Sequence, residues 1–322
     1  MFARLVAWLR RQQIPFSENA AIAPHLYFRI GGTVSLLVSP ASTAERQAVL
    51  EELAGVPRGG GLGDRRPFLV IGGGSNIAFP DGLTRAAVVL AQVPAPLPAP
   101  VLLADDGSLQ VDAGMRNQPF LSWCAANGAG GLEFLSGIPG TLGGAAAVNA
   151  GAFGCCLADV LLGADIVDER GEVRAVDAGH FGFQYRDSRF KMGRETLLAL
   201  RLRFIPTAEA AIAKKVRNNL DYRVRRHPSY RLASAGCFFK NPLAGGVKTS
   251  AGKLIESCGL KNTVLGDLAV AAEHANFLLN RGQGTFADLQ RLEEKIRTAV
   301  AARCGIVLER EVIYVSEDGI KY

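Results

Sequence analysis

The stretch GLEFLSGIPGTLGGAAAVNAGAFG, residues 131–154, says most about the fold of this chain. Glycines cluster where a backbone turns sharply or comes close to a ligand, and this segment is dense in them. No lysine follows in the position that a P-loop requires, so the segment does not predict a nucleoside-triphosphate site. It predicts either a large ligand that contacts bare backbone or a purely structural turn.

The other glycine cluster, Gly72–Asn76, comes earlier in the chain and is called the first cluster, with residues 137–154 as the second cluster; it directly follows the predicted buried strand Phe68–Ile71. Consecutive glycines expose backbone N–H groups that can form a nest for a pyrophosphate. The cluster is not the dinucleotide fingerprint G-x-G-x-x-G, because Ile77 stands where its last glycine belongs and no clear helix follows. A tight turn explains three glycines equally well. Two such clusters in one domain nevertheless favour one large ligand with phosphates, such as a dinucleotide.

The composition is typical of a folded protein with two domains and perhaps a third small one. Of the 322 residues, 48% are apolar and 20% are charged, which excludes general disorder. No apolar stretch approaches the ~18 residues that a membrane span needs. Arg4, Arg10 and Arg11 give the N-terminal segment the pattern of an amphipathic helix rather than a secretory signal. We therefore expect a soluble, cytoplasmic protein.

The cysteines and histidines predict neither a metal site nor a disulfide framework. The six cysteines include no C-x-x-C pair, and His227 and His274 lack metal-ligand spacing. Reduced thiols in a cytosol are the natural interpretation.

The net charge of +6 fits nucleic acid or any other anionic ligand. The candidate for nucleic-acid binding is the basic predicted helix 208–226, which contains Lys214, Lys215 and Arg217. Aromatic residues make up only 7% of the chain and do not form the stacking stripe of single-strand binders. The residues alone thus predict a nucleotide-cofactor protein, most simply an enzyme.

Apolar runs, caps and turn residues predict the other elements. In the first half they predict an N-terminal helix, a helix opened by Ser42 or Thr43, a surface loop at 58–67, a connector at 92–100, a strand at 109–114, a helix at 118–127, hairpin strands at 164–167 and 172–176, and a strand at 197–205. Pro206 closes this half and marks the predicted domain boundary. In the second half they predict helices at 208–226, 251–258 and 285–304 and a final strand at 307–315, without internal repeats.

Eight segments together resemble the UDP-N-acetylenolpyruvoylglucosamine reductases, flavoenzymes of bacterial cell-wall precursor synthesis. They are FRIGG at 28–32, IGGGSN at 71–76, GLEFLSGIPGTLGGAAAVNAGAFG at 131–154, YRDSRFK at 185–191, SAGCFFKNP at 234–242, AGKLIESCGLKN at 251–262, HANFLLN at 274–280 and LEREV at 308–312. Each is weak alone, but the ordered set spans nearly the whole chain and is highly specific.

The resemblance implies an α+β fold with an FAD-binding domain of the vanillyl-alcohol-oxidase type and a separate α+β substrate domain. The implied ranges are 1–206 for the first domain, with subdomains at about 1–66 and 67–206, and 207–304 for the second; residues 305–322 return to the FAD region. The residues implied to bind FAD are Gly72, Gly73, Gly74, Ser75, Asn76, Gly137, Ile138, Pro139, Gly140, Thr141, Gly143, Gly144, Asn149 and Gly151.

The resemblance also implies the reaction. NADPH reduces FAD, and the enolpyruvyl ether of UDP-N-acetylglucosamine then receives the hydride and becomes UDP-N-acetylmuramate. By family motif, Arg186 and Glu311 stabilise the charge that develops on the substrate carboxyl group, and Cys237 protonates the adjacent carbon. The implied substrate contacts are Tyr185, Lys240, Asn241, Lys253, His274 and Asn276.

The chain departs from many relatives in three places. Cys237 stands where many carry serine; a thiol of unperturbed pKa ~8.5 is the stronger acid and can do the same work. The pair Ala147-Val148 replaces a bulkier pair and carries no functional prediction. No insertion follows Lys191 to supply a substrate-capping tyrosine loop, so the chain resembles the shorter type.

Two alternatives stay open on the sequence. One is another flavoprotein oxidase of the same fold; such enzymes often tether flavin through histidine, which neither glycine cluster contains, so we expect FAD to be bound non-covalently. The other is a non-enzymatic nucleic-acid binder. We expect a monomer or a weak homo-oligomer, with no nucleic-acid or membrane partner.

Overall fold

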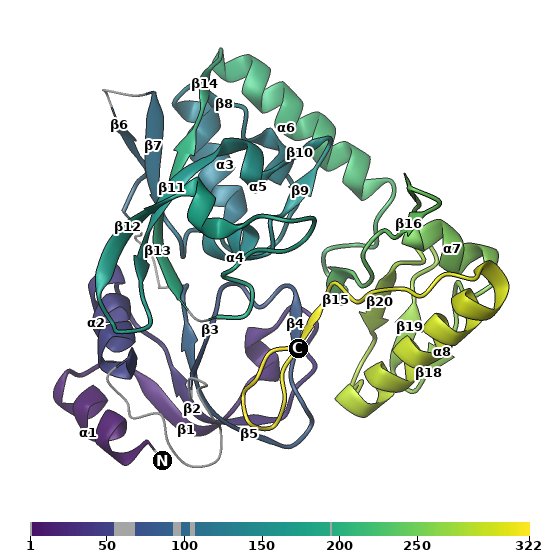
Figure 1. The fold of residues 1–322 in the computed structure, drawn as a ribbon, viewed down its shortest axis with the longest axis horizontal. Coiled ribbons are helices and arrows are strands. Elements are labelled where there is room, and N and C mark those ends of the chain that lie inside the picture. Colours follow the sequence, from purple (N-terminus) through teal and green to yellow (C-terminus); the bar gives the residue numbers. More distant parts are fainter. Residues whose placement is uncertain (1, 55–67, 93–97, 104–106, 194) are drawn as a thin grey trace. The chain divides into compact units, whose positions relative to one another are not determined.

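The computed structural model describes residues 2–54, 68–92, 98–103, 107–193 and 195–322 (Figure 1). The chain divides into two compact units, neither continuous in sequence. The first unit comprises Met1–Glu18, Leu36–Gly73 and Ala86–Tyr222, and the second Asn19–Ser35, Gly74–Arg85 and Arg223–Tyr322. The predicted loop 58–67 and residues 93–97 of the predicted connector lie outside the described residues.

A five-stranded antiparallel sheet carries one core of the first unit (Figure 1). Its order is β12 (Val173–Asp177), β11 (Leu161–Val167), β13 (Thr196–Arg203), β7 (Ser108–Asp112) and β6 (Val101–Leu103). Buried side chains of β13 join those of α3 (Asn117–Ala126) and α4 (Leu142–Ala147) in this core. The predicted hairpin and the predicted helix at 118–127 are confirmed, with ends shifted by a few residues.

A second core of the first unit lies where α1 (Ala3–Arg11) and α2 (Thr43–Ala54) contribute Leu9 and Leu50. Phe68 and Val89 join them from β3 (Phe68–Ile71) and β5 (Leu83–Leu90), which pair in parallel. These strands belong to a sheet of order β1-β2-β5-β3, with β1 at Phe16–Ala21 and β2 at Thr33–Val38. Helix α2 begins as predicted, because the Ser42 hydroxyl accepts the Glu45 N–H at 3.1 Å.

Short elements complete the first unit. They are β8 (Ala129–Gly130), η2 (Glu133–Leu135), β9 (Gly151–Ala152), β10 (Cys155–Cys156), α5 (Leu157–Val160), η3 (Ala178–Phe181) and β14 (Ile205–Pro206). Helix α6 (Glu209–Val224) belongs to this unit up to Tyr222.

The second unit is built on a four-stranded sheet of order β15 (Ala233–Cys237), β20 (Phe277–Asn280), β19 (Leu268–Val270) and β18 (Val264–Leu265). Helices α7 (Ala251–Ser257) and α8 (Phe286–Cys304) share a buried core with it. Thr285 caps α8 by accepting the Asp288 N–H at 3.0 Å, and Gly305 ends it in the left-handed conformation. The unit also contains η1 (Ala23–His25) and the hairpin of β16 (Leu243–Ala244) and β17 (Val247–Lys248).

The predicted final strand at 307–315 is wrong in its extent. Only Ile313–Tyr314 (β21) forms a strand, and it pairs in parallel with β4 (Ile77–Ala78). Arg310, further upstream, instead forms a single bridge with Phe239. The sequence predicts one strand here, but the two extended parts of the segment pair with two different short segments. No continuous ladder therefore forms.

Candidate cofactor and active site

The two glycine clusters touch one another inside the first unit. A Cβ atom added to Gly72 would lie 2.4 Å from Thr141 Oγ1, and one added to Gly73 would lie 2.6 Å from Gly140 Cα. Real Cβ atoms do not approach other heavy atoms so closely, and at Gly73 the obstacle is backbone, so the second cluster leaves no room for a side chain at 73 and crowds one at 72. The structure thus brings together the predicted cofactor residues from segments about seventy positions apart.

The second cluster is held by the turn that follows β7. Leu142 N–H donates to the Met115 carbonyl at 2.9 Å, and Gly143 N–H donates to the Ala113 carbonyl at 2.7 Å. On the other side, the buried Asn117 side chain donates to the Ile138 carbonyl at 3.0 Å. Sequence analysis did not single out Asn117, because nothing local marks its contact with a loop twenty residues away.

A buried ion pair fixes that turn in its place. The guanidinium of Arg46, on α2, makes two hydrogen bonds of 2.8 and 2.9 Å to Asp112 at the end of β7. It also donates to the Ala91 carbonyl at 2.8 Å, and Asp112 accepts the Gly114 N–H at 2.7 Å. Such a pair destabilises the fold strongly if one partner is removed. This pair was not predicted, although the sequence contains a signal for it. Arg46 lies on the same helical face as the buried Val49, Leu50 and Leu53.

The backbone at the first cluster suits a phosphate-bearing cofactor. In the part of the chain that the structure describes, the N–H groups of Gly73 and Gly74 donate to no other group. Two consecutive N–H groups without side chains around them can hold phosphate oxygens. The residues at this cluster therefore fit a dinucleotide such as FAD.

Arg186 is tied to the end of the second cluster. Its guanidinium donates to the Asn149 carbonyl at 3.2 Å and to the Gly151 carbonyl at 2.6 Å. The Asn149 side chain in turn donates to the Gln184 carbonyl at 2.9 Å, and the Tyr185 ring lies 5.4 Å from the guanidinium carbon. These contacts give Arg186 a fixed orientation beside residues predicted to bind the cofactor.

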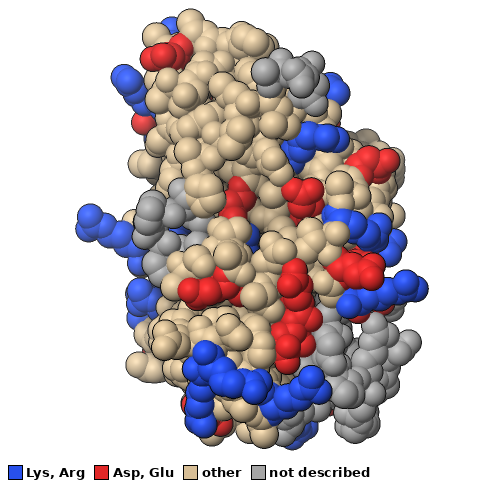
Figure 2. All heavy atoms as spheres, turned by 90° about the vertical axis from the view of Figure 1, so that its left-hand side faces the viewer, with Lys and Arg blue, Asp and Glu red and all other residues tan. Residues whose placement is uncertain are grey.

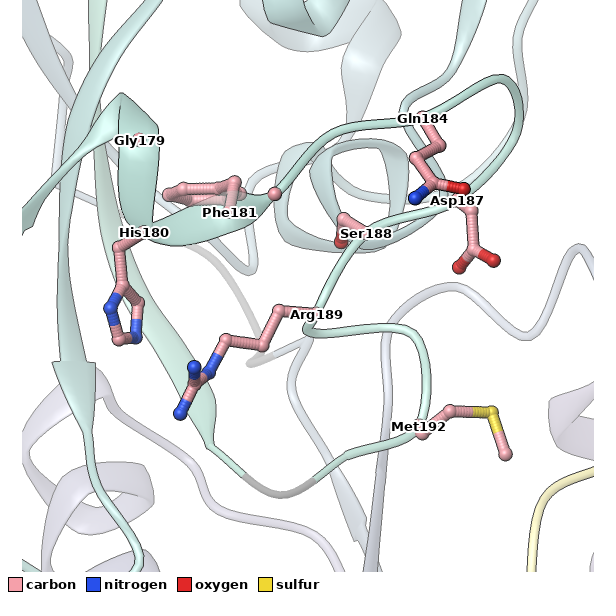
Figure 3. A pocket seen from close by; sticks show the side chains of 9 residues that line it. Gly179, His180, Phe181, Gln184, Asp187, Ser188, Arg189 and Met192 are labelled. Carbon is pink, nitrogen blue, oxygen red and sulfur yellow. The ribbon is translucent and has the colours of Figure 1, made fainter.

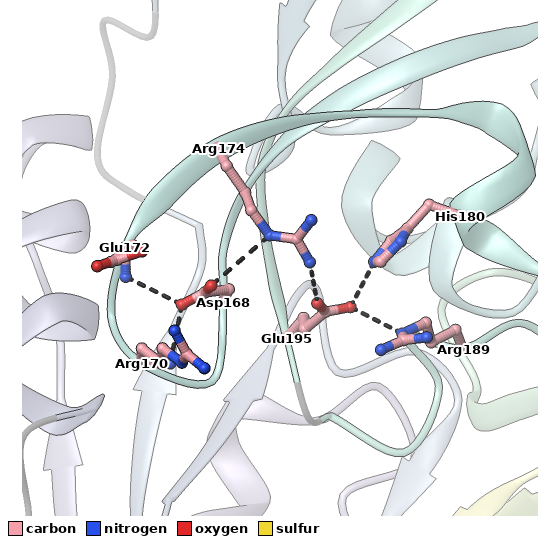
Figure 4. Close-up of polar contacts among 7 residues, drawn as sticks. All are labelled: Asp168, Arg170, Glu172, Arg174, His180, Arg189 and Glu195. Carbon is pink, nitrogen blue, oxygen red and sulfur yellow. Dashed lines mark hydrogen bonds and ion pairs between the residues drawn. The ribbon is translucent and has the colours of Figure 1, made fainter.

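The loop that carries Arg186 is anchored by the buried carboxylate of Glu195 (Figure 4). His180 Nε2 lies 2.7 Å from it, Arg189 Nε donates at 2.9 Å and Arg174 donates at 2.8 Å. Burial raises the pKa of Glu195, but the hydrogen bonds and charges of His180 and Arg189 outweigh it, so the net pKa is lowered.

A cavity of about 550 Å³ opens beside the same loop (Figure 3). His180 and Arg189 line it together with Asp187, whose carboxylate points away from Arg189 in Figure 3. Side chains of both charges line the cavity, and Arg186 is not among the lining residues. We therefore assign the cavity no part in the reaction.

Cys237 and Glu311 are brought together in the second unit. Cys237 ends β15, and the carbonyl of the next residue, Phe238, accepts the Glu311 N–H at 2.8 Å. The Glu311 carbonyl accepts a hydrogen bond of 3.3 Å from the Asn76 side chain, a residue predicted to bind the cofactor. The two predicted catalytic residues of this unit therefore lie on neighbouring backbone segments.

The predicted substrate residues of the second unit differ in what they contact. Lys240 pairs with Glu309 at 2.5 Å, and the Asn241 side chain accepts the N–H of Ala251 at the start of α7 at 2.9 Å. Lys253 lies in the first turn of α7. Asn276 is 2% exposed and bonds to Phe239, which favours a structural role for its side chain.

Three rings pack together beside β20. His227 lies 5.5 Å from His274 and 5.0 Å from Phe277, measured between ring centroids. Burial lowers the pKa of His227 from 6.5 to about 4, and the charges of Arg223 and His274 act in the same direction. Burial also lowers the pKa of His274, whose Nδ1 accepts the Asn276 N–H at 3.2 Å. Both rings are therefore neutral at pH 7.

A neutral, half-buried histidine makes stability depend on pH. Between pH 4 and 6.5 the unfolded chain binds a proton at His227 that the folded chain excludes. The free energy of unfolding should therefore fall as the pH drops from 6.5 to 4 and be insensitive to this group above 6.5. We expect His227→Phe to flatten this fall in denaturant titrations, whereas His25→Gln, at an exposed position, should not. An unchanged slope in His227→Phe would contradict the assignment.

Two side chains of the basic helix α6 contact the rest of the first unit. Lys215 Nζ lies 3.2 Å from a carboxylate oxygen of Glu133, whose side chain is 4% exposed. Asn219 donates to the Glu133 carbonyl at 2.9 Å. Figure 2 shows the face at the left of Figure 1, where basic and acidic side chains both occur. The contact with Glu133 therefore accounts for the charge of Lys215 without an external anionic partner.

Lys215 and Lys214 should consequently differ in their effect on stability. Among the described residues, Lys215→Gln leaves the buried carboxylate with the Gly131 N–H as its hydrogen-bond donor, and we expect a loss of about 1 kcal/mol in the free energy of unfolding. Lys214→Gln, at an exposed position, should stay within about 0.5 kcal/mol of wild type. Chemical denaturation of both variants measures this, and equal effects would show that the Lys215 pair contributes nothing.

Within the described residues, no group of three histidine, cysteine, aspartate or glutamate side chains could hold a metal ion. None of the described helices is long and apolar enough to cross a membrane. None of the six cysteines, all of which lie among the described residues, forms a disulfide.

Two family descriptions match the chain. Residues 34–177 match the FAD binding domain, and residues 227–315 match the C-terminal domain of UDP-N-acetylenolpyruvoylglucosamine reductase. The second match contains Cys237, Asn276 and Glu311.

Curated relatives and a solved structure extend the match to the full length. The UDP-N-acetylenolpyruvoylglucosamine reductase of Geobacter metallireducens is 35% identical over 99% of both chains. That of Protochlamydia amoebophila is 37% identical over 78% of this chain and 80% of its own. The crystal structure of the enzyme from Thermus caldophilus, 26% identical, superimposes with a TM-score of 0.72 and covers 94% of this chain and 98% of its own.

Proposed function

The chain belongs to the UDP-N-acetylenolpyruvoylglucosamine reductase family, and from this premise we propose that it reduces the enolpyruvyl ether of UDP-N-acetylglucosamine to UDP-N-acetylmuramate with NADPH. The predicted family, the α+β fold with an FAD-binding domain and a C-terminal domain, and FAD as the cofactor are confirmed. The observation that carries the proposal is the match to a reductase over 99% of both chains.

FAD, when bound, would supply the chemistry that this chain's side chains cannot, namely hydride transfer between NADPH and the terminal methylene carbon of the substrate. We propose that the cluster Gly72–Asn76 and the segment Gly137–Gly144 hold its pyrophosphate and flank its ring. The free N–H groups of Gly73 and Gly74 support this. The ion pair of Arg46 with Asp112 keeps the second cluster in place.

The protein's own contribution to the chemistry is to stabilise charge and to deliver a proton. Arg186, held by two backbone carbonyl groups, is directed at the substrate carboxylate as negative charge develops there. Glu311 can assist only as a hydrogen-bond donor, so we propose that its carboxyl group is protonated when substrate is bound. The Cys237 thiol then gives its proton to the adjacent carbon, which completes the lactyl ether.

Isotopic labelling tests the proposed function. With NADPH carrying deuterium on its transferable position, the new methyl group of the product should carry that deuterium in those turnovers that outpace exchange of the reduced flavin's N–H with water. In D₂O with unlabelled NADPH, one deuterium should enter the adjacent carbon. NADPH consumption that yields hydrogen peroxide and leaves the sugar nucleotide unchanged would favour the alternative, an oxidase of the same fold.

A further inference from the structure

The segment Cys237–Lys240 connects the proposed proton donor to the backbone segment that carries Glu311. Phe238 and Phe239 are both 1% exposed. The Phe238 carbonyl accepts the Glu311 N–H at 2.8 Å, and Lys240 N–H donates to the Glu309 carbonyl at 2.8 Å. Any shift of this segment would therefore move Cys237 and Glu311 together.

The ladder that should hold this segment is broken just before Cys237. Strand β15 pairs with β20 as Ser234 with Leu279 and Cys237 with Phe277, with an irregularity between the two pairs. Gly236 lies in this irregularity with φ +76°, a conformation that favours glycine. Bulges of this kind re-aim the following side chain and end regular pairing. Strand pairing alone thus does not fix the backbone beyond Cys237.

Asn276 holds the backbone beyond the point where the strand pairing ends. Its side-chain oxygen accepts the Phe239 N–H at 2.9 Å, and its side-chain amide donates to the Phe239 carbonyl at 2.8 Å. Its own carbonyl accepts the Phe238 N–H at 2.7 Å. A carboxamide offers a donor and an acceptor at once, which lets it imitate one more residue of a strand.

We propose that Asn276 is a positioning residue for proton transfer: by holding Phe238 and Phe239 it keeps the Cys237 thiol, and the segment of Glu311 bonded to Phe238, in place. Its side chain does so through Phe239 and does not itself contact substrate. The inference rests on the proposed function in taking Cys237 as the proton donor.

Asn280 offers a matched control on the same strand. It is also buried, donates to the Phe28 carbonyl at 3.1 Å and accepts the N–H groups of Gly282 and Gly284 at 3.2 and 3.0 Å. Asn280 therefore holds backbone groups as Asn276 does, but at the end of β20 that lies away from Cys237. The two residues differ in which backbone they hold.

The test compares Asn276→Asp with Asn280→Asp in the FAD-loaded protein. Asn276→Asp keeps the acceptor for Phe239 N–H but places an oxygen against the Phe239 carbonyl. We expect flavin reduction by NADPH to stay within about twofold of wild type. Reoxidation by substrate should slow about 10- to 100-fold, the loss in rate that a small misplacement of a reacting group causes. Asn280→Asp should lose comparable stability and keep both rates.

Two further readouts do not depend on turnover. Amide hydrogen exchange at Phe239 and alkylation of Cys237, mapped by mass spectrometry, should both speed up at least about tenfold in Asn276→Asp and not in Asn280→Asp. Should Asn276→Asp fail to fold, Asn276→Gln is measured in the same way.

The outcomes separate the inference from the proposed function. Wild-type reoxidation rates in a folded Asn276 variant, with unchanged exchange at Phe239, would overturn the positioning role. If the wild type is not reoxidised by the enolpyruvyl sugar nucleotide at all, the proposed function fails. The exchange and alkylation measurements then still decide whether Asn276 fixes this segment.

Discussion

Cys237→Ala is expected to slow reoxidation of the reduced flavin by substrate at least about 100-fold, the low end for general-acid catalysis, with flavin reduction by NADPH close to wild type. The two half-reactions separate because Cys237 acts only after hydride has left the flavin. Anaerobic stopped-flow absorbance of each half-reaction measures the two rates independently.

Cys237→Ser is the control for this prediction. A hydroxyl in the same position should keep much more activity than alanine and should remove inhibition by thiol alkylation. Four of the other five thiols should react poorly, because burial raises the pKa of Cys124 to about 12 and that of Cys155 to about 11, and it also raises the pKa of Cys156 and of Cys258. Equal reoxidation by Cys237→Ala and wild type would make Cys237 a packed thiol and Glu311 the next candidate for the proton donor.

Gly73→Asp is expected to give colourless, destabilised protein. Its Cβ would lie 2.6 Å from Gly140 Cα, which forces the two glycine clusters apart. Overpacking of this kind costs about 1–3 kcal/mol, and the carboxylate would in addition repel the flavin pyrophosphate. Flavin absorbance per protein and the denaturation midpoint measure the two effects.

Two alanine variants separate packing from charge. Gly73→Ala should lose stability and part of its FAD affinity without the added repulsion. Gly82→Ala should change neither, because a Cβ there would meet nothing within 4 Å. Normal flavin content at normal yield in Gly73→Asp would remove the first cluster from the cofactor site.

Elements marked by local signals were predictable from the sequence. Strand Phe68–Ile71 ends at the glycines that follow it, and α8 begins after the Thr285 cap and ends before Gly305. The segment 307–315 was not, because its two strand-like parts contact different partners far away in the chain. A periodic pattern predicts that a strand can form but does not name the segments it pairs with.

The candidate site divides in the same way. The glycine clusters were predictable as cofactor residues, and the structure adds that they contact one another. The ion pair of Arg46 with Asp112 joins positions 66 residues apart. The sequence therefore offers only one signal for it, the position of Arg46 on the buried face of its helix. Asn276 was expected to bind substrate, a prediction that stays untested, whereas its contacts with Phe239 depend on a strand irregularity that the sequence does not reveal.

The central claim is that one flavin carries electrons from NADPH to the enolpyruvyl sugar nucleotide. The most direct test is to reduce the purified protein with NADPH without oxygen, remove the excess, and add the enolpyruvyl ether of UDP-N-acetylglucosamine. The account predicts that the oxidised flavin spectrum returns as the lactyl ether forms. A flavin that stays reduced until oxygen is admitted would contradict it.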